Sequence, residues 1–410
     1  MKSFNIDGIP QPLFHRLEQM GYIAPTPIQE KAIPPALLGK DILGSAQTGT
    51  GKTAAFGIPL VTQLLNNTRW IALVLLPTRE LAAQVLTELE KFIGNSKIKT
   101  ALLIGGEAMP KQFRQLNLDP RLIVGTPGRV HDHLERGTLM LHQANFLVLD
   151  EADRMLDMGF GVQLDKIARF LTRKRQTLMF SATMPENIKK LAGKYLTDPV
   201  RIAVGDAHAP AVKVEQENVM IEDAEKFPRL VKELKSRTGS IIVFVKTKQG
   251  ADRMASKLQK SGHSAEALHG GLRQSKRDRV IADFRDMKFG ILVATDVAAR
   301  GLDIPHIEHV INFNLPKNPE DYIHRIGRTA RAGAKGNAIN FISSAESFEW
   351  KAISRLLNPN NKPEQAPRKK SVNKKKISDN NVDKKRSDNN VDTKPPVLAK
   401  KRRLFWQRKP

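Results

Sequence analysis

The sequence has no cysteine among its 410 residues and no unbroken apolar stretch of about 18 residues, the length that spans a bilayer. The lack of cysteine excludes disulfides and thiolate metal sites, and it fits a reducing compartment, so we expect a cytoplasmic protein. The lack of a long apolar stretch argues against a transmembrane helix. The N-terminal segment MKSFNIDGIPQPLF also lacks the apolar core of a secretory signal peptide.

Acidic residues are in short supply too. Lys and Arg number 67 against 42 Asp and Glu, which gives a formal net charge of +25. Such an excess indicates a polyanionic partner, either nucleic acid or an anionic membrane surface. The membrane alternative has only charge in its favour, so we expect nucleic acid and no membrane association. Residues 358–410 hold 17 basic and 5 acidic residues, so this segment contributes +12 and the preceding part contributes the other +13.

Short apolar runs alternate with segments of helical periodicity along most of the chain. The runs are continuous, which predicts parallel strands covered on both faces. Strands that alternate with helices form βαβ units and therefore doubly wound α/β domains. The expected strands span residues 41–46, 70–76, 99–106, 121–126, 146–150 and 177–183, then 240–246, 264–270, 290–296, 308–314 and 337–343.

The periodicity lapses at residues 205–213, where we expect a linker between two domains, 1–207 and 208–357. Residues 358–410 are too polar to bury a core, so we expect a disordered basic tail. The tail contains a near-repeat of nine residues, SDNNVDKKR followed by SDNNVDTKP, and it ends with Phe405 and Trp406 among basic residues. Such a tail is suited to attracting phosphates and stacking bases. A solubilising tail without a target is the alternative.

A glycine-rich turn, AQTGTGKT, follows the first expected strand and precedes a helical segment. This arrangement presents backbone N–H groups and a positive helix end to phosphates. Lys52 would reach the β- and γ-phosphates, and the Thr53 hydroxyl would lie on Mg²⁺. The strict phosphate-loop pattern fails at its first position, Ala46, and an ordinary flexible loop is the alternative. The nucleotide-binding residues expected here are Gln47, Thr48, Gly49, Thr50, Gly51, Lys52 and Thr53.

Three carboxylates follow the apolar strand 146–150, in the order Asp150, Glu151 and Asp153. Like charges this close repel and need compensation. In nucleoside triphosphatases, an Asp at such a strand end holds Mg²⁺, and Asp150 is placed for that role together with Lys52. Glu151 would then orient and deprotonate the attacking water. The alternative is an acidic cluster stabilised by a helix N-terminus.

Residues 150–153 spell DEAD, and the chain resembles the DEAD-box ATP-dependent RNA helicases, in our interpretation the bacterial RhlE-like group. The match covers about residues 4–345. The resemblance implies two tandem RecA-like domains, ATP and Mg²⁺ as cofactors, and ATP hydrolysis coupled to local separation of duplex or structured RNA. An ATP-gated RNA clamp or assembly scaffold with little unwinding is one alternative, and a DNA-directed helicase or translocase is another.

The resemblance also assigns roles in the first half of the chain. The segment GYIAPTPIQ implies that Gln29 reads the adenine base and that Tyr22 stacks. PTRELAAQ, the Gly105–Gly106 pair and TPGR match segments that line RNA, and SAT matches the segment that couples hydrolysis to strand separation. The implied RNA contacts are Pro77, Arg79, Gly105, Gly106, Thr126 and Arg129, and the implied coupling residues are Asp153, Ser181 and Thr183.

In the second half, ATDVAARGLD implies RNA contact by Thr295 and ribose contact by Asp303, and HRIGRTARAG implies Arg328 and Arg331 as arginine fingers. Two arginines three positions apart share a helical face. Guanidinium groups are suited to phosphate, and on a second domain they would complete the site only on closure. The family usually has glycine at Ala330. We expect a helical backbone there, in which alanine is harmless.

RNA contact should be mainly to phosphate and sugar and hence weakly sequence-specific. The sequence leaves the physiological RNA open, with ribosomal or RNA-decay assemblies among the partners considered.

Overall fold

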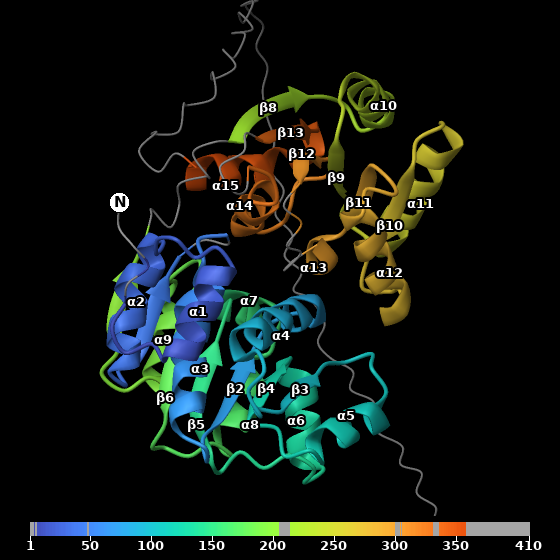
Figure 1. The fold of residues 1–410 in the computed structure, drawn as a ribbon. Helices are drawn as coiled ribbons and strands as arrows, with labels where there is room; N and C mark the ends of the chain where they lie inside the picture. The colour runs from blue at the N-terminus through green and yellow to red at the C-terminus, as the bar shows by residue number, and fades with distance from the viewer. Residues whose placement is uncertain are drawn as a thin grey trace, which may run out of the picture. The chain divides into compact units, whose positions relative to one another are not determined.

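The computed structural model describes residues 4, 6–46, 49–204, 214–299, 304, 306–330 and 336–357 (Figure 1). The expected linker at 205–213 and the expected tail at 358–410 lie outside the described residues. No helix in the described ranges is long and apolar enough to cross a membrane. We call the described residues up to 204 the first lobe and those from 214 onward the second lobe.

The first lobe is built on a seven-stranded sheet in the order β3-β4-β2-β5-β6-β1-β7, and every pairing in it is parallel. Its strands are β1 (Ile42–Ser45), β2 (Ile71–Leu75), β3 (Thr100–Leu103), β4 (Leu122–Gly125), β5 (Ala144–Leu149), β6 (Gln176–Ser181) and β7 (Val200–Ala203). Its helices are α1 (Gln11–Gln19), α2 (Pro27–Leu37), α3 (Lys52–Asn66), α4 (Arg79–Ile93), α5 (Met109–Leu116), α6 (Pro127–Glu135), α7 (Ala152–Asp157), α8 (Gly161–Ala168) and α9 (Glu186–Tyr195).

The second lobe repeats this plan with a six-stranded parallel sheet in the order β10-β11-β9-β12-β13-β8. Its strands are β8 (Val214–Met220), β9 (Ser240–Phe244), β10 (Ala265–Leu268), β11 (Ile291–Ala294), β12 (Ile307–Asn312) and β13 (Gly336–Ile342). Its helices are α10 (Lys226–Ser236), α11 (Lys248–Lys260), α12 (Gln274–Arg285), α13 (Asp296–Ala299), α14 (Pro319–Ile326), the short 3₁₀ helix η1 (Ser344–Glu346) and α15 (Ser347–Leu357).

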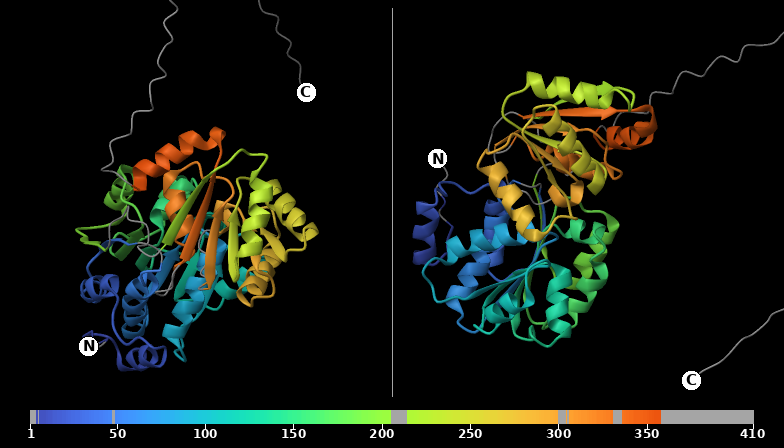
Figure 2. Two further views of the ribbon diagram at one scale, coloured as in Figure 1. Left: turned by 90° about the horizontal axis from the view of Figure 1, so that it is seen from above. Right: turned by 90° about the vertical axis from the view of Figure 1, so that its right-hand side faces the viewer.

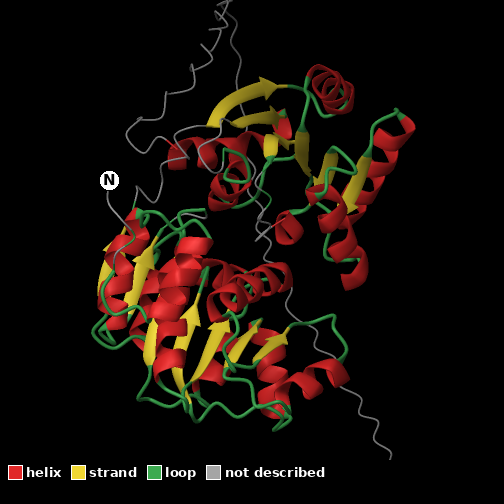
Figure 3. Ribbon diagram, in the orientation of Figure 1, coloured by secondary structure: helices red, strands yellow, loops and turns green. Residues whose placement is uncertain are grey.

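Helices flank the strands of each lobe in Figures 2 and 3. Successive residues of one strand therefore enter different cores: Phe146 and Val148 of β5 pack on one face of the sheet, and Leu147 and Leu149 pack on the other. A strand buried on both faces must be apolar at every position, which is why its sequence shows a continuous run. The two parallel-sheet α/β domains expected from the sequence are thus confirmed.

Two strands were not expected from the sequence. Both lie at a sheet edge, β7 beside β1 and β8 beside β13. The residues of β8 are exposed or partly exposed along its whole length, with the sequence VEQENVM. Edge strands carry charged and polar residues because they are solvated, and such strands lack the apolar run that marked the others.

The expectation of a helical backbone at Ala330 was wrong. The helix α14 ends at Ile326, and Ala330 has a φ of +56° in the left-handed region. The chain turns here after Thr329, whose N–H donates to the Ile326 carbonyl at 3.2 Å. An alanine in this region carries a steric cost that glycine does not.

Candidate active site

The site is set by the order of three neighbouring strands in the first lobe. β5, β6 and β1 are adjacent and parallel, so their carboxyl ends share one edge of the sheet. The glycine-rich turn follows β1, Asp150 follows β5, and Ser181 ends β6. In open α/β sheets, ligands bind outside this edge. The fold therefore brings the turn after β1 next to two segments that come much later in the sequence.

The glycine-rich turn has the backbone that its sequence requires. Gly49 and Gly51 have φ values of +82° and +91°. A Cβ on Gly51 would also lie 2.5 Å from the Gln29 amide nitrogen, so this position has no room for a side chain. Lys52 begins α3, and its buried ammonium donates to the Ala46 carbonyl at 2.8 Å. Gln47 and Thr48 lie outside the described residues.

Gln29 fastens the helix α2 to this turn. Its side-chain oxygen accepts from the Thr26 N–H at 2.9 Å, and its amide nitrogen donates to the Gly51 carbonyl at 3.1 Å. The side chain is buried, and both of its polar atoms are engaged by the protein. Contact with an adenine base stays a prediction, but the link between α2 and the phosphate turn is present in the structure.

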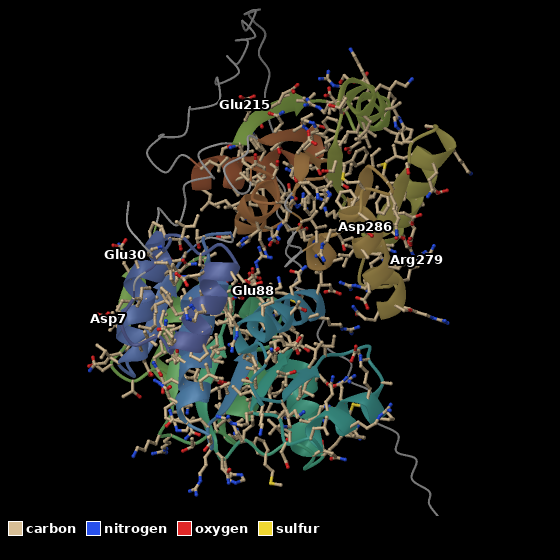
Figure 4. The ribbon with its side chains drawn as sticks, viewed as in Figure 1. Asp7, Glu30, Glu88, Glu215, Arg279 and Asp286 are labelled. Atoms are coloured by element: carbon tan, nitrogen blue, oxygen red, sulfur yellow. The ribbon has the colours of Figure 1, made fainter. Side chains whose placement is uncertain are left out.

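Tyr22 packs edge-on against Phe4 and Phe92, with ring centroids 5.6 and 6.0 Å apart. Its hydroxyl donates to Glu88 of α4 at 3.1 Å, and Glu88 is labelled in Figure 4. Burial and the neighbouring Glu88 carboxylate raise the pKa of Tyr22. The structure thus holds the ring firmly beside the segment that precedes α2, and its stacking role stays a prediction.

The carboxylate of Asp150 lies in a dry and electrostatically unbalanced position. Asp150 is only 4% exposed to solvent. Burial raises the pKa of Asp150 to about 6, with Lys52 opposing the shift and Glu151 adding to it. A cation beside this carboxylate would remove the imbalance, so the donor fits Mg²⁺. Among the described residues, no group of three or more His, Asp or Glu could hold a metal. Mg²⁺ usually binds through one or two carboxylates, water and substrate phosphates, and the Asp150 carboxylate is a donor of this kind.

Glu151 follows with φ +52° and ψ +50°, which places a non-glycine residue in the left-handed region. Its N–H donates to the Asp150 carboxylate at 2.9 Å. The conformation ends β5 sharply, so that α7 starts at the next residue, Ala152. Strained backbone of this kind clusters at functional sites.

Asp153 joins the DEAD segment to the end of β6. One carboxylate oxygen accepts from the Ala182 N–H at 3.0 Å, from the Thr183 N–H at 2.9 Å and from the Thr183 hydroxyl at 3.0 Å. The Ser181 hydroxyl donates to the Thr183 carbonyl at 2.7 Å. The structure therefore brings the three predicted coupling residues into one hydrogen-bonded unit.

A cavity of about 640 Å³ collects most of the predicted RNA contacts. It also takes in Lys246, Lys248 and Arg277, which add positive charge. Gly106 does not line it but adjoins Arg79, since a Cβ on Gly106 would lie 2.2 Å from the Arg79 guanidinium. The predicted residues that line the cavity are Pro77, Arg79, Gly105, Thr126, Arg129 and Thr295.

Two residues of α12 contact α4 beside this cavity. Arg277 pairs with Glu80 at 2.8 Å, and both side chains are buried. Gln274 donates to Glu80 at 3.1 Å and accepts from Arg79 at the same distance. Burial and the nearby Arg277 charge lower the pKa of Arg79. Glu80 had no predicted role, although it lies in the PTRELAAQ segment.

In the second lobe, Arg325 is the best-bound arginine of the HRIGR segment. It pairs with both carboxylate oxygens of Asp296, at 2.5 and 2.8 Å, and it donates to Asn312 and to the Asn314 carbonyl. Arg328 is also buried, and its Nε donates to the His324 carbonyl at 3.1 Å. Arg331 and Asp303 lie outside the described residues.

Arg325, Asp296 and Arg154 had no role predicted from the sequence. Arg325 and Asp296 lie 29 positions apart, and each stands within a segment where another residue carried the implied role. Arg154 follows DEAD directly and reads as a surface residue of a short helix. The sequence signal that could have identified these three residues is a charged residue inside a segment that must be buried.

Both halves of the chain match family models. Residues 26–191 match the DEAD/DEAH box helicase family, and residues 225–333 match the helicase conserved C-terminal domain. The ATP-dependent RNA helicase CshA of Listeria monocytogenes is 42% identical over 371 residues, which cover 90% of this chain and 71% of that protein. The DEAD-box ATP-dependent RNA helicase CshA of Bacillus subtilis is 43% identical over 354 residues, 86% of this chain and 71% of that protein.

Solved structures agree with these matches. S. cerevisiae Dbp5 bound to RNA and ADP BeF3 superposes with a TM-score of 0.78 at 35% identity, covering 87% of this chain and 94% of that one. Mss116p bound to ssRNA and AMP-PNP gives a TM-score of 0.79 at 30% identity, with 86% and 76% covered.

Proposed function

This chain belongs to the DEAD-box ATP-dependent RNA helicases, and on that premise we propose how its residues divide the work of ATP hydrolysis and strand separation. The observation that carries the proposal is the shared edge of β1, β5 and β6, where Lys52, Asp150 and Glu151 meet. The raised pKa of Asp150 supports a cation partner at that edge.

Lys52 binds the β- and γ-phosphates of ATP by exchanging its contact with the Ala46 carbonyl for phosphate oxygens. Asp150 and the Thr53 hydroxyl would hold Mg²⁺, which supplies positive charge to the phosphates when bound. Glu151 accepts a proton from the water that attacks the γ-phosphorus. Gln47, Thr48, Gly49, Thr50 and Gly51 form the cradle for the phosphates.

The second lobe completes the nucleotide site. Arg328 and Arg331 act as arginine fingers on the γ-phosphate, and Asp303 contacts the ribose. The burial of Arg328 supports a fixed position for the first finger. A finger contributes about 10³ to 10⁵ in rate in related phosphoryl-transfer enzymes, so lobe closure would control hydrolysis. Gln29 and Tyr22 select the adenine base.

RNA lies in the cavity lined by Arg79, Arg129 and Thr295, with its phosphates toward the arginines. The hydrogen bonds from Thr183 to Asp153 couple this region to the nucleotide. Because the contacts are mainly to phosphate and sugar, binding is weakly sequence-specific. Separation of strands is local, because one nucleotide cycle supplies enough free energy for a few base-pair steps of about 1.4 kcal/mol each.

The finer assignments from the sequence belong to the same proposal. The relatives reported above carry the CshA name, so placement in the RhlE-like group rests on sequence resemblance alone. A cytoplasmic location, ribosomal or RNA-decay assemblies as partners, and a basic tail that attracts RNA are proposed on the same footing. The excess of 17 basic over 5 acidic residues in 358–410 supports the role of the tail.

The general-base role is tested with Glu151→Gln. We expect this variant to bind ATP and RNA with unchanged affinity and to lose RNA-stimulated ATP turnover, because the amide cannot accept the proton. Glu186→Gln, on the solvent-exposed side of α9, is the matched control and should keep full activity. Undiminished hydrolysis by Glu151→Gln would refute the role.

Strand separation is tested on matched RNA and DNA duplexes with the full chain. We expect RNA to stimulate ATPase activity and RNA duplexes to open, whereas DNA does neither. A long-lived complex on RNA with ATP and little strand separation would favour the clamp instead. Stimulation by DNA equal to that by RNA would favour a DNA-directed enzyme.

Removal of residues 358–410 tests the tail. We expect weaker RNA affinity and a smaller slope of log affinity against log salt concentration, because fewer counterions are released on binding. ATP affinity should be unchanged. An unchanged salt slope would show that the tail does not contact RNA.

A further inference from the structure

The guanidinium of Arg154 is a buried cation that forms no hydrogen bond with the described residues. Arg154 lies in α7, directly after the DEAD segment, and is 1% exposed. None of its three guanidinium nitrogens has a hydrogen-bond partner among the described residues. A guanidinium with five N–H donors is costly to bury in this state, and each such group in a native structure calls for an explanation.

The nearest opposite charge is the carboxylate of Glu151. Arg154 Nε lies 3.6 Å from Glu151 Oε2, too far for a hydrogen bond but close enough for an ion pair. Glu151 Oε2 is also buried and has no hydrogen-bond partner in the described part of the chain. Arg154 and Glu151 Oε2 are thus two buried groups of opposite charge that lie close together, and neither has a hydrogen-bond partner among the described residues.

The second lobe also contributes residues beside Arg154. Arg154 lines a small cavity together with Phe244, Asp296, Arg325 and Arg328, the last of which is a proposed arginine finger. Asp296 is already paired with Arg325. The guanidinium thus stands between the proposed general base on one side and a prearranged set of second-lobe charges on the other.

We propose that Arg154 is a positioning residue that transmits lobe closure to Glu151. Charges from the second lobe confine the guanidinium, and the confined guanidinium fixes the Glu151 carboxylate where it accepts the proton of the attacking water. When the second lobe withdraws, Arg154 is hydrated and Glu151 is no longer held. The inference rests on the proposed general-base role of Glu151.

The first test compares steady-state ATP hydrolysis by Arg154→Met and Arg154→Lys in the full chain. Met keeps the length and bulk of the side chain without its charge, and we expect the RNA-saturated kcat to fall about 10- to 100-fold, within the range that general-base catalysis supplies. The KM for ATP and the affinity for fluorescent ADP should change less than threefold. Lys keeps the charge near Glu151 and should recover kcat to within about fivefold of the natural chain.

The control is Arg121→Met. Arg121 is another partly buried arginine of the first lobe, but it donates to the carbonyls of Leu64, Asn67 and Trp70 and is remote from the proposed chemistry. We expect this variant to lose thermal stability while it keeps kcat below its melting temperature. An equal loss of kcat in Arg121→Met and Arg154→Met would overturn the proposal, since a general loss of structure would explain both. If Arg154→Met does not fold, Arg154→Gln replaces it in every comparison.

A second readout is independent of activity. The melting temperatures of Arg154→Met, Glu151→Gln and the double variant, all with saturating RNA and AMP-PNP to favour the closed state, form a double-mutant cycle. We expect the two single shifts to sum to more than the shift of the double variant, because each single change leaves the other charge buried and unpaired. Additive shifts would overturn the direct pairing.

The failure of this inference can be told apart from failure of the proposed function. If Glu151→Gln hydrolyses ATP normally, the general-base role falls whatever Arg154 does. If Glu151→Gln is inactive while Arg154→Met keeps its kcat, the general-base role stands and only the role of Arg154 is refuted.

Discussion

Replacing Ala330 with glycine tests the backbone conformation beside the proposed arginine fingers, because the sign of the change in the free energy of unfolding depends on that conformation. A left-handed alanine costs about 1–2 kcal/mol relative to its normal region. Glycine removes that cost but adds about 0.4–1 kcal/mol of unfolded-state entropy. With φ at +56°, Ala330→Gly should therefore stabilise the chain by about 0.5–1 kcal/mol. A helical Ala330 would give the opposite sign, a loss of about 1 kcal/mol.

The assay is thermal and urea unfolding of the full chain, with two control variants in the same lobe. Met287→Gly replaces another left-handed residue, φ +58°, that is exposed and remote from the site, and it should stabilise by a similar amount. Ala282→Gly changes an exposed position inside α12 and should destabilise by about 1 kcal/mol. If Ala330→Gly behaves like Ala282→Gly, the left-handed assignment and the reasoning from it are refuted.

Three further outcomes are expected. The folded-state pKa of Asp150 is about 6, above its ordinary 3.8, so ionisation of Asp150 lowers the stability of the nucleotide-free protein as pH rises from 4 to 6. Asp150→Asn should therefore raise the free energy of unfolding by up to about 3 kcal/mol at pH 7. In melting curves at pH 5 this gain in stability should be smaller. Thr183→Val removes one of the three hydrogen bonds to Asp153 and should lower RNA strand separation at least fivefold while ATP turnover changes less than twofold; equal losses would argue against a coupling role. Glu80→Gln and Arg277→Gln should each lower the free energy of unfolding by about 3–5 kcal/mol, because each leaves one charge of a buried pair without its partner. A double-mutant cycle measured by urea unfolding should show strong non-additivity. Independent effects would mean that the 2.8 Å contact contributes no pairing energy.

The strands in the interior of both sheets could be predicted because burial on two faces leaves a continuous apolar run. β5 is an example, with Phe146 and Leu147 entering different cores. The edge strands β7 and β8 could not, because a solvated edge tolerates charges such as those of Glu215 and Glu217, which resemble a loop. Glu215 is labelled on β8 in Figure 4. The pairing of strands could not be predicted from the sequence, because it joins residues that are far apart in the chain. For example, β13 pairs with β8, which lies more than 100 positions earlier.

Residues of the candidate site were predictable where the chemistry depends on neighbours in the chain. Gly49, Gly51 and Lys52 form a local pattern whose backbone demands are visible in the sequence. The partners of Glu80 and Arg154 were not predictable, since an arginine or a glutamate next to a motif usually points to solvent. Only the packing shows that these charges are buried, and burial converts them from surface residues into determinants of the site. The prediction of a helical backbone at Ala330 was wrong for a related reason, because the helical spacing of the arginines was extended past the end of α14.

The two lobes differ in how far their charges are satisfied. Arg325 in the second lobe has an ion pair with Asp296 and two further acceptors, so it is fixed before any ligand arrives. In the first lobe, Asp150 is buried with a raised pKa, and the Arg154 guanidinium has no hydrogen-bond partner in the described part of the chain. Preorganised groups lower the cost of binding, whereas unsatisfied groups gain the most from a new partner. Nucleotide phosphates and their cation should therefore order the first lobe against a second lobe that is already rigid, and the free energy of closure should come chiefly from charges on the first-lobe side.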